Sequence, residues 1–137
     1  MKITAALISA ILLVACNFVS MPINVLTSFS KSFPAGKEPH WKNVAGNYKV
    51  NFKINNLKMS ATYDSKGNWL ETEAPIGFSE LPATVSLYLE NHYKGINVND
   101  AACVRKENGE INYETGIKGK DLVFDIKGNF IKEEAEE

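Results

Sequence analysis

Two stretches of the chain, YDSKGNWLETE at residues 63–73 and FDIKGNFIKEE at residues 124–134, are near copies of each other. Both contain an aspartate, then Lys-Gly-Asn, an aromatic residue, an aliphatic residue and a glutamate, in the same order. Asp-x-Lys-Gly is typical of a tight turn, because aspartate bonds to its own backbone and glycine accepts positive φ. A repeated turn with strand-like flanks predicts that the same hairpin is made twice.

The repeat extends well beyond the hairpin. Pairs of similar residues keep an offset of 61 positions through the hairpin and the preceding strand: Asp64 and Asp125, Gly67 and Gly128, Val50 and Ile111. An offset of 60 relates Pro22 to Pro82, where two helical patterns begin. A one-residue insertion or deletion in a loop accounts for the difference. The sequence therefore predicts a tandem duplication, with repeats at about 21–76 and 77–134.

Each repeat is predicted to be a helix followed by an antiparallel β-meander. Apolar residues at three- and four-residue steps predict helices over 22–33 and 82–94. Alternating apolar and polar residues, separated by turn signals such as Asn55-Asn56 and Asn108-Gly109, predict eight strands: 39–44, 48–54, 57–63, 69–74, 103–107, 110–116, 120–125 and 129–134. One apolar sheet face with helices to cover it gives an α+β fold, with both helices on one face of an antiparallel sheet.

Composition places the chain among globular proteins. It has 137 residues, of which 45% are hydrophobic and 23% charged, and a formal net charge of −1. Such a charge creates no field that would attract nucleic acid or an anionic membrane. The halves differ, since residues 17–73 carry seven lysines against four acids, whereas residues 74–137 carry seven basic residues against twelve acids. Much of the second excess falls in the closing EEAEE, which we interpret as a solvated terminus.

The first 20 residues are predicted to be a signal peptide. One lysine is followed by an apolar run that is too short for a membrane anchor. The run ends in Leu-Val-Ala-Cys at residues 13–16, which is similar to the lipobox of bacterial lipoproteins. We therefore expect export to the periplasm or to the outer membrane as a lipoprotein, with Cys16 as the lipidated first residue. Secretion without lipidation is the alternative.

Replacing Cys16 by serine tests this prediction. A serine has no thiol to carry the lipid, so the variant is expected to lose labelling by a fatty-acid analogue and to move from the membrane to the soluble fraction. Labelling and fractionation of cells that express each form measure both changes. Unchanged fractionation and mass would leave simple secretion as the better account.

No constellation of side chains indicates catalysis or metal binding. Only Cys103 would remain after processing, and we interpret it as a small buried hydrophobe in a strand. His40 and His92 lie in unrelated elements, without the spacing of a zinc site. The repeated turns lack the alternating oxygen ligands of a calcium loop, and nucleophile, phosphate-loop and dinucleotide motifs are missing. We predict a protein that is not an enzyme and needs neither cofactor nor metal.

The order of these motifs resembles the PepSY-like family of exported bacterial proteins, also called β-lactamase-inhibitor-like. The resemblance runs over about residues 21–134 and rests on Leu81-Pro82 before a helix, HWKNV at 40–44, YKVNF at 48–52, the Tyr-Asp-x-x-Gly hairpin and a second such copy. It implies two α-plus-sheet units that share one antiparallel sheet, in a single domain over residues 21–137. It also implies no enzymatic activity, and binding or inhibition of another protein. The second copy departs from the pattern, because Ala102 stands at the place that matches Trp41.

Two functions are consistent with this organisation. The first is a cell-envelope binding module, possibly inhibitor-like, that uses the uncovered sheet face against an unidentified envelope protein or peptide. The second is an envelope structural protein or a carrier of a small apolar ligand, which would need an apolar internal cavity. Large core residues favour the first. Neither involves nucleic acid, and contact with a membrane is expected only through the lipid anchor.

Alternation predicts where binding residues lie on the uncovered face. Glu71 and Glu73 are costly in a core, so Trp69, at the same parity, is predicted to lie beside them on the open face. Phe130 takes the matched position in the second repeat. Two aromatic residues among charged neighbours are typical binding anchors. The alternative is ordinary packing within the fold.

Overall fold

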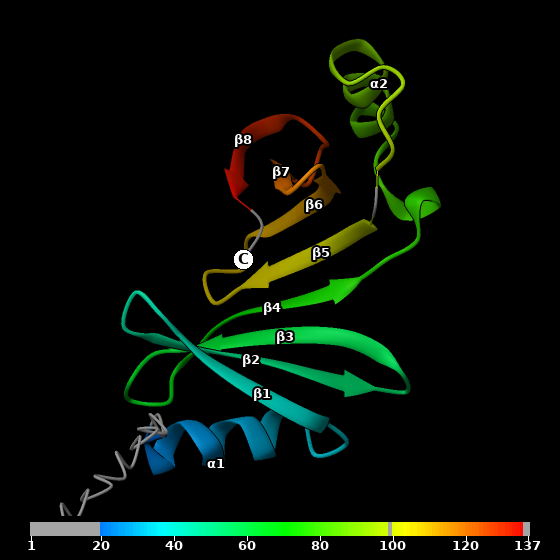
Figure 1. Cartoon of the computed structure of the whole chain (residues 1–137). Coiled ribbons are helices and arrows are strands. Elements are labelled where there is room, and N and C mark those ends of the chain that lie inside the picture. Colours follow the sequence, from blue (N-terminus) through cyan, green and yellow to red (C-terminus); the bar gives the residue numbers. More distant parts are fainter. Residues whose placement is uncertain (1–19, 99, 136–137) are drawn as a thin grey trace, which may run out of the picture.

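A computed structural model of the protein describes residues 20–98 and 100–135 (Figure 1). Its elements, in chain order, are α1 (Ile23–Ser32), β1 (Lys37–Val44), β2 (Asn47–Ile54), β3 (Leu57–Tyr63), β4 (Trp69–Pro75), a short 3₁₀ helix η1 (Phe78–Glu80), α2 (Ala83–His92), β5 (Asp100–Lys106), β6 (Ile111–Ile117), β7 (Lys120–Phe124) and β8 (Phe130–Ala135). Most of the predicted signal peptide and Cys16 lie outside the described residues. No helix in the described ranges is long and apolar enough to cross a membrane.

The strands form one eight-stranded sheet in the order β1 to β8, and every neighbouring pair is antiparallel. The α+β class is confirmed, and the predicted strands and helices are each found within three residues of their expected ends. α1 lies at the end of the molecule formed by β1–β3, and α2 lies at the opposite end (Figure 1). The pairing of β4 with β5 joins the two halves into one continuous surface.

Short turns with positive φ connect the strands within each half. Asn55 and Asn56 between β2 and β3 have φ of 49° and 65°, and Lys118 and Gly119 between β6 and β7 have φ of 42° and 75°. Two-residue loops with positive φ match the right-handed twist of the flanking strands. The Asn55-Asn56 turn was predicted from the tolerance of asparagine for this conformation, and that prediction is confirmed.

The first core cluster joins α1 to β2 and β3. Val25 and Phe29 on one side of α1 pack against Val50, Phe52, Ala61 and Tyr63. The ring of Phe29 lies 5.1 Å from Phe52 and 5.5 Å from Trp41, both in edge-to-face contact. Edge-to-face geometry suits the charge distribution of aromatic rings. The apolar side of α1 therefore covers this half of the sheet.

The second core cluster has the same plan with different side chains. Leu81 and Val85, at the start of α2, pack against Ala101, Ile117, Leu122 and Phe124. Cross-strand partners share a face of a sheet, and the pairs Val50–Ala61, Ala61–Thr72 and Thr72–Arg105 connect the first cluster to the strand that carries Ala101. Both clusters therefore lie on one face, and no helix among residues 20–98 and 100–135 covers the other face of the sheet.

The repeated turns have the same hydrogen bonds. The Asp64 carboxylate accepts from the backbone N–H groups of Lys66 and Asn68 at 2.8 and 2.9 Å, and Asp125 accepts from those of Lys127 and Asn129 at 2.9 Å each. The hydrogen bonds of each turn lower the pKa of its aspartate. The largest effect comes from the bond that the asparagine side chain donates. The conserved order of residues in the two stretches thus encodes one turn geometry.

Each turn also docks on the helix of its own half. The Ser28 hydroxyl of α1 donates to the Gly67 carbonyl at 2.7 Å, and the Thr84 hydroxyl of α2 donates to the Lys127 carbonyl at 2.7 Å. Gly67 and Gly128, which have φ of 87° and 82°, bring the backbone against the helix with no side chain between. The repeated stretch therefore does two things: it reverses the chain and fixes the helix.

Candidate functional site

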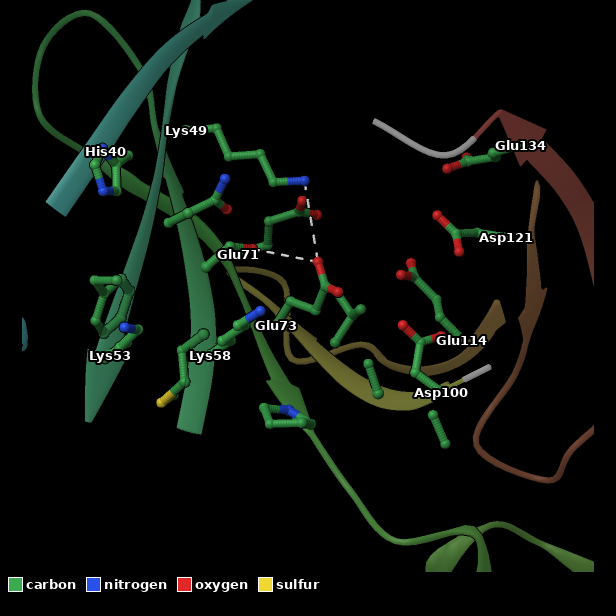
Figure 2. Close-up of a pocket in the computed structure, with 18 of the residues that line it drawn as sticks. His40, Lys49, Lys53, Lys58, Glu71, Glu73, Asp100, Glu114, Asp121 and Glu134 are labelled. Atoms are coloured by element: carbon green, nitrogen blue, oxygen red, sulfur yellow. Dashed lines mark hydrogen bonds and ion pairs between the residues drawn. The ribbon is translucent and has the colours of Figure 1, made fainter. Parts of the chain in front are cut away.

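The uncovered face of the sheet, called here the open face, is hollowed across its middle. The hollow has a volume of about 700 Å³ and is lined from β1 to β8, and half of the residues that line it are charged (Figure 2). Glu71 and Glu73 of β4 lie between the two halves, at the floor. This hollow is the candidate functional site because residues from both halves of the sheet contribute to it.

Opposite charges line the two sides of the hollow. One side, from β2 and β3, carries Lys49, Lys53 and Lys58, called here the lysine side. The other side, from β5 to β8, is called here the acidic side and consists of four carboxylates: Asp100, Glu114, Asp121 and Glu134. Figure 2 shows the two groups facing each other across β4. The uneven charge of the two halves is thus concentrated on this one face.

Several of these side chains are anchored within the face. The Ser60 hydroxyl donates to Glu73 at 3.2 Å, and the Lys49 ammonium lies 4.0 Å from the same carboxylate. Asp100 accepts from the Gly116 N–H at 3.0 Å, which points its carboxylate across the neighbouring strand. Lys53 pairs with Glu38 at 2.7 Å near the rim. The charged groups therefore have defined positions rather than extending freely into solvent.

Glu114 occupies the most perturbed position of the acidic side. Burial raises the pKa of its carboxyl to about 7, and repulsion from Glu73, Asp121, Glu134 and Glu71 adds to the effect. A carboxyl group with such a pKa is partly protonated near neutral pH. Lys132 of β8 forms an ion pair with Glu134 and lies near Glu114, so it offsets part of this repulsion.

Glu114→Gln is expected to remove a pH dependence of stability between about pH 4.5 and 7. The folded state binds a proton that the unfolded state, with the ordinary pKa near 4.5, releases, so the free energy of unfolding falls as pH rises through this window. The fall is about 2 kcal/mol after allowance for solvent screening. Urea denaturation at pH 5 and at pH 8 measures the difference in the free energy of unfolding. The same slope in Glu114→Gln would show that the proton is bound elsewhere.

The prediction that Trp69 lies on the open face is wrong. The register shifts between Thr62 and Tyr63, so that Glu71 pairs with Thr62 but Trp69 pairs with Tyr63. This bulge adds one residue to β4 and breaks the alternation, which turns the indole to the helix-covered face. There Trp69 packs on the first core cluster, and its N–H donates to the Thr72 hydroxyl at 2.8 Å.

Phe130 is displaced by the matching bulge. Phe124, a residue of the second core cluster, pairs with Phe130, and the register shifts between Val123 and Phe124. The Phe130 ring stacks on Tyr88 of α2 at 4.7 Å with 8° between the planes. Phe130 is therefore also on the helix side, where 38% of it stays exposed. A binding role for either aromatic residue stays a prediction, but the open-face position on which it was based is wrong.

Trp69→Ala is expected to lower the free energy of unfolding by about 2–3 kcal/mol. Full truncation of a buried aromatic residue costs about 3–5 kcal/mol, and Trp69 is only partly buried. Chemical denaturation of the purified domain measures the loss. Phe78→Ala, which truncates an aromatic residue that is 48% exposed, serves as the control and is expected to change stability by about 0.5 kcal/mol or less. Equal effects would contradict the placement of Trp69 in the core.

A smaller groove lies on the helix-covered face, where neither helix covers the centre of the sheet. It has a volume of about 360 Å³ and is lined by Met59, Thr72, Ala74, Ile76, Glu80, Cys103, Arg105 and Tyr113. Cys103 is only partly buried here, so its interpretation as a buried hydrophobe holds in part.

The histidines stand apart from one another. His40 lines the hollow from β1, whereas His92 ends α2, stacks on Tyr88 at 4.1 Å and contacts the Tyr88 carbonyl through Nδ1 at 3.0 Å. Within residues 20–98 and 100–135, no group of three or more His, Cys, Asp or Glu side chains is arranged to hold a metal ion. The acidic side therefore contains closely spaced carboxylates without the convergence that metal coordination requires.

The chain matches the model of one protein family. Residues 46–132 match the family described as "Putative beta-lactamase-inhibitor-like, PepSY-like". The chain belongs to the PepSY-like family. The resemblance in its motifs is thereby confirmed for most of the sheet, from the β1–β2 turn into β8. None of the curated proteins matches the chain.

Solved structures with the same fold come from Bacteroides species. A structure from Bacteroides eggerthii described as "putative periplasmic proteins" has a TM-score of 0.69 at 16% identity and covers 83% of this chain and 88% of its own. A DUF2874 family protein from Bacteroides uniformis has a TM-score of 0.67 at 18% identity, covering 83% and 88%. A BLIP-like protein from Bacteroides fragilis has a TM-score of 0.58 at 22% identity, covering 82% and 84%. Because the sequence identities are low, what the PepSY-like chain shares with these proteins is the fold.

Proposed function

We propose that the protein is a non-enzymatic binding module of the bacterial cell envelope, which holds another protein or a peptide on its open face. The observation that carries the proposal is the hollow of about 700 Å³, lined by charged side chains from both halves of the sheet. A face that is hollowed and charged is suited to a polar, protruding partner segment. In the part of the chain that the structure describes, no helix covers this face, so such a segment can reach it.

Export is part of the same proposal. The signal-peptide pattern of residues 1–20 supports it, as does the description of a structural neighbour as periplasmic. The BLIP-like description of another neighbour supports inhibitor-like binding as one form of the function. Lipidation at Cys16 would hold the module at a membrane surface.

We also infer that the two halves descend from one duplicated unit. The matched hydrogen bonds of Asp64 and Asp125, and the matched contacts of Ser28 and Thr84 with the turns, support this origin. Duplication joins two half-sheets edge to edge and so produces a binding face wider than either unit. Opposite charges on the two halves then distinguish the two sides of that face.

The carrier alternative is less well supported. A carrier of an apolar compound needs a cavity lined mainly by apolar side chains. Half of the residues that line the hollow are Lys, Glu or Asp, and the groove at Cys103 mixes apolar residues with Glu80 and Arg105. The chemistry of both spaces favours a polar partner.

Site-specific photocrosslinking in the envelope tests the proposal. A photoreactive amino acid replaces Lys58 or Ala102 on the open face, or Leu26 or Lys31 on α1 as matched controls. Discrete adducts from the open-face positions, and none from α1, are the expected result. Adducts confined to α1, or none from any position, would overturn the assignment of the open face as the binding surface.

A further inference from the structure

The groove on the helix-covered face has an apolar floor made by three neighbouring strands. Ala74 of β4 is the register partner of Cys103 of β5, which in turn pairs with Tyr113 of β6. Paired residues direct their side chains to the same face of a sheet, and these three, called here the apolar strip, are all half-buried. Met59 and Ile76 also line the groove. The centre of this face therefore presents apolar side chains that are only partly covered.

Two hydrogen-bond donors lie at one end of the apolar strip. Thr72 and Arg105 both line the groove and are register partners, so their side chains lie next to each other on one face. The Thr72 hydroxyl accepts from the Trp69 N–H at 2.8 Å, which leaves its own O–H to donate. Arg105 is exposed, and its guanidinium forms no hydrogen bond or ion pair within residues 20–98 and 100–135. This end of the groove therefore offers an unpaired cation beside a hydroxyl donor.

The opposite end of the groove is acidic. Glu80 of η1 lines it, and the Glu80 carboxylate accepts from the Gly77 N–H at 2.6 Å. Ile76 belongs to the same end, where its N–H donates to the Ala101 carbonyl at 3.0 Å. Along β5, Ala101 and Arg105 are four residues apart, which is about 13 Å at about 3.3 Å per residue. An anionic group in the groove would be attracted to the Arg105 end and repelled by Glu80.

The floor between these ends favours a ligand that is polar at one end only. The backbone groups of β4, β5 and β6 beneath it bond to one another in the sheet. A peptide lying along the apolar strip would leave its own N–H and C=O groups without partners there, which is costly where water is excluded. The groove has a volume of about 360 Å³, which is the size of a site for a small molecule.

From these observations we propose a second binding site in this groove, for a small amphipathic carboxylate with an unbranched apolar chain. Its carboxylate accepts two hydrogen bonds from the Arg105 guanidinium, in the geometry that these two groups favour, and a third from Thr72. Its chain lies along the apolar strip towards Ile76. At about 1.3 Å per carbon atom, about eight to ten carbons span the length of the groove.

This ligand differs from the neutral apolar compound of the carrier alternative, because its charged group pairs with Arg105. The site also lies on the face opposite the open face. It therefore goes beyond the proposed function and does not depend on it.

Calorimetric titration with octanoate, and with octanol as its uncharged analogue, tests the proposal. The protein carries Cys16→Ser, so that Cys103 is the only thiol in the chain. The rate at which Cys103 reacts with iodoacetamide then reports whether the ligand covers the apolar strip. Octanoate is expected to bind at least tenfold more tightly than octanol, and to slow the reaction of Cys103 at least fivefold at saturation.

Two substitutions test the two ends of the ligand separately. Arg105→Met removes the cation and keeps an unbranched side chain, whereas Ala74→Leu fills the floor. The matched control is Lys42→Met, which removes a cation from the other face of the sheet, since the adjacent Trp41 packs on the first core cluster. Circular dichroism checks that each variant is folded. Arg105 is exposed, so its variant is expected to fold and decides the result alone if Ala74→Leu does not.

Arg105→Met and Ala74→Leu are each expected to weaken octanoate binding at least tenfold, whereas Lys42→Met is expected to stay within twofold of the parent. Equal affinities for octanoate and octanol, or an unchanged affinity in Arg105→Met, would overturn the recognition of a carboxylate. No binding of octanoate, or binding that leaves the reaction of Cys103 unchanged, would overturn the site itself. The binding function of the open face would stand in either case.

Discussion

Replacing Phe29 by alanine is expected to lower the free energy of unfolding by about 3–5 kcal/mol, as for other buried aromatic residues. The side chain is 7% exposed, and its ring contacts Phe33, Trp41 and Phe52 with centroids 5.9, 5.5 and 5.1 Å away. Truncation would remove three ring contacts at once and leave a cavity between α1 and the sheet. Together with Val25 and the Ser28 hydrogen bond, this side chain holds the first helix on the sheet.

Denaturation in urea, followed by circular dichroism, measures the loss. Ile23→Ala is the matched control, because Ile23 lies on the same helix and is 72% exposed. Its substitution is expected to change the free energy of unfolding by about 0.5 kcal/mol or less. If the two variants were equally stable, α1 would not be fixed to the sheet through Phe29.

Much of the fold was predictable because two periodicities are clear in the sequence. Val25 and Phe29 follow the helical period, whereas Val50 and Phe52 follow the alternation of a strand, and all four enter one core cluster. The repeated turn then placed the hairpins correctly. These features depend on local spacing alone, so they can be predicted from the sequence.

The position of Trp69 could not be predicted in the same way. Alternation counts residues within one strand, but a bulge depends on how that strand pairs with its neighbour. The shift between Thr62 and Tyr63 reverses the face of Trp69 while Glu71 keeps its own. The sequence signal for this shift is weak, since no glycine or proline marks the bulge. Aromatic residues were therefore assigned to the face that they do not occupy.

The charged face was missed for a related reason. Much of the excess of acids in the second half was attributed to the closing EEAEE, although Asp100, Glu114 and Asp121 lie well before it. Their placement near one another depends on the register between β5, β6 and β7, which brings residues up to 21 positions apart onto one face. Alternation within each strand would have assigned Glu114 to the polar face, but not beside Asp121. A site assembled across strands becomes visible only with the pairing known.

Gly67→Ala and Gly128→Ala are each expected to destabilise the protein by about 3 kcal/mol or more, for the same reason in both halves. Positive φ costs an alanine about 1–2 kcal/mol, and both glycines have φ above 80°. A Cβ at Gly67 would lie 2.7 Å from the Asn24 carbonyl oxygen of α1, and a Cβ at Gly128 would lie 2.9 Å from the Pro82 side chain before α2. Each turn would have to move away from its helix, which would add about 1–3 kcal/mol and weaken the Ser28 or Thr84 hydrogen bond.

Gly46→Ala and Gly109→Ala separate the two contributions. These glycines have φ of 85° and 84°, but no atom lies within 4 Å of an added Cβ. Their substitution is expected to cost only the backbone strain, about 1–2 kcal/mol. Urea denaturation of the four variants gives the comparison. A larger loss at Gly67 and Gly128 would show that the repeated stretch fixes each helix to its sheet, because, of the four substituted glycines, Gly67 and Gly128 lie against a helix and Gly46 and Gly109 do not. Four equal losses would instead indicate that both stretches are ordinary turns. Contact with a helix would then not explain why the two stretches are similar.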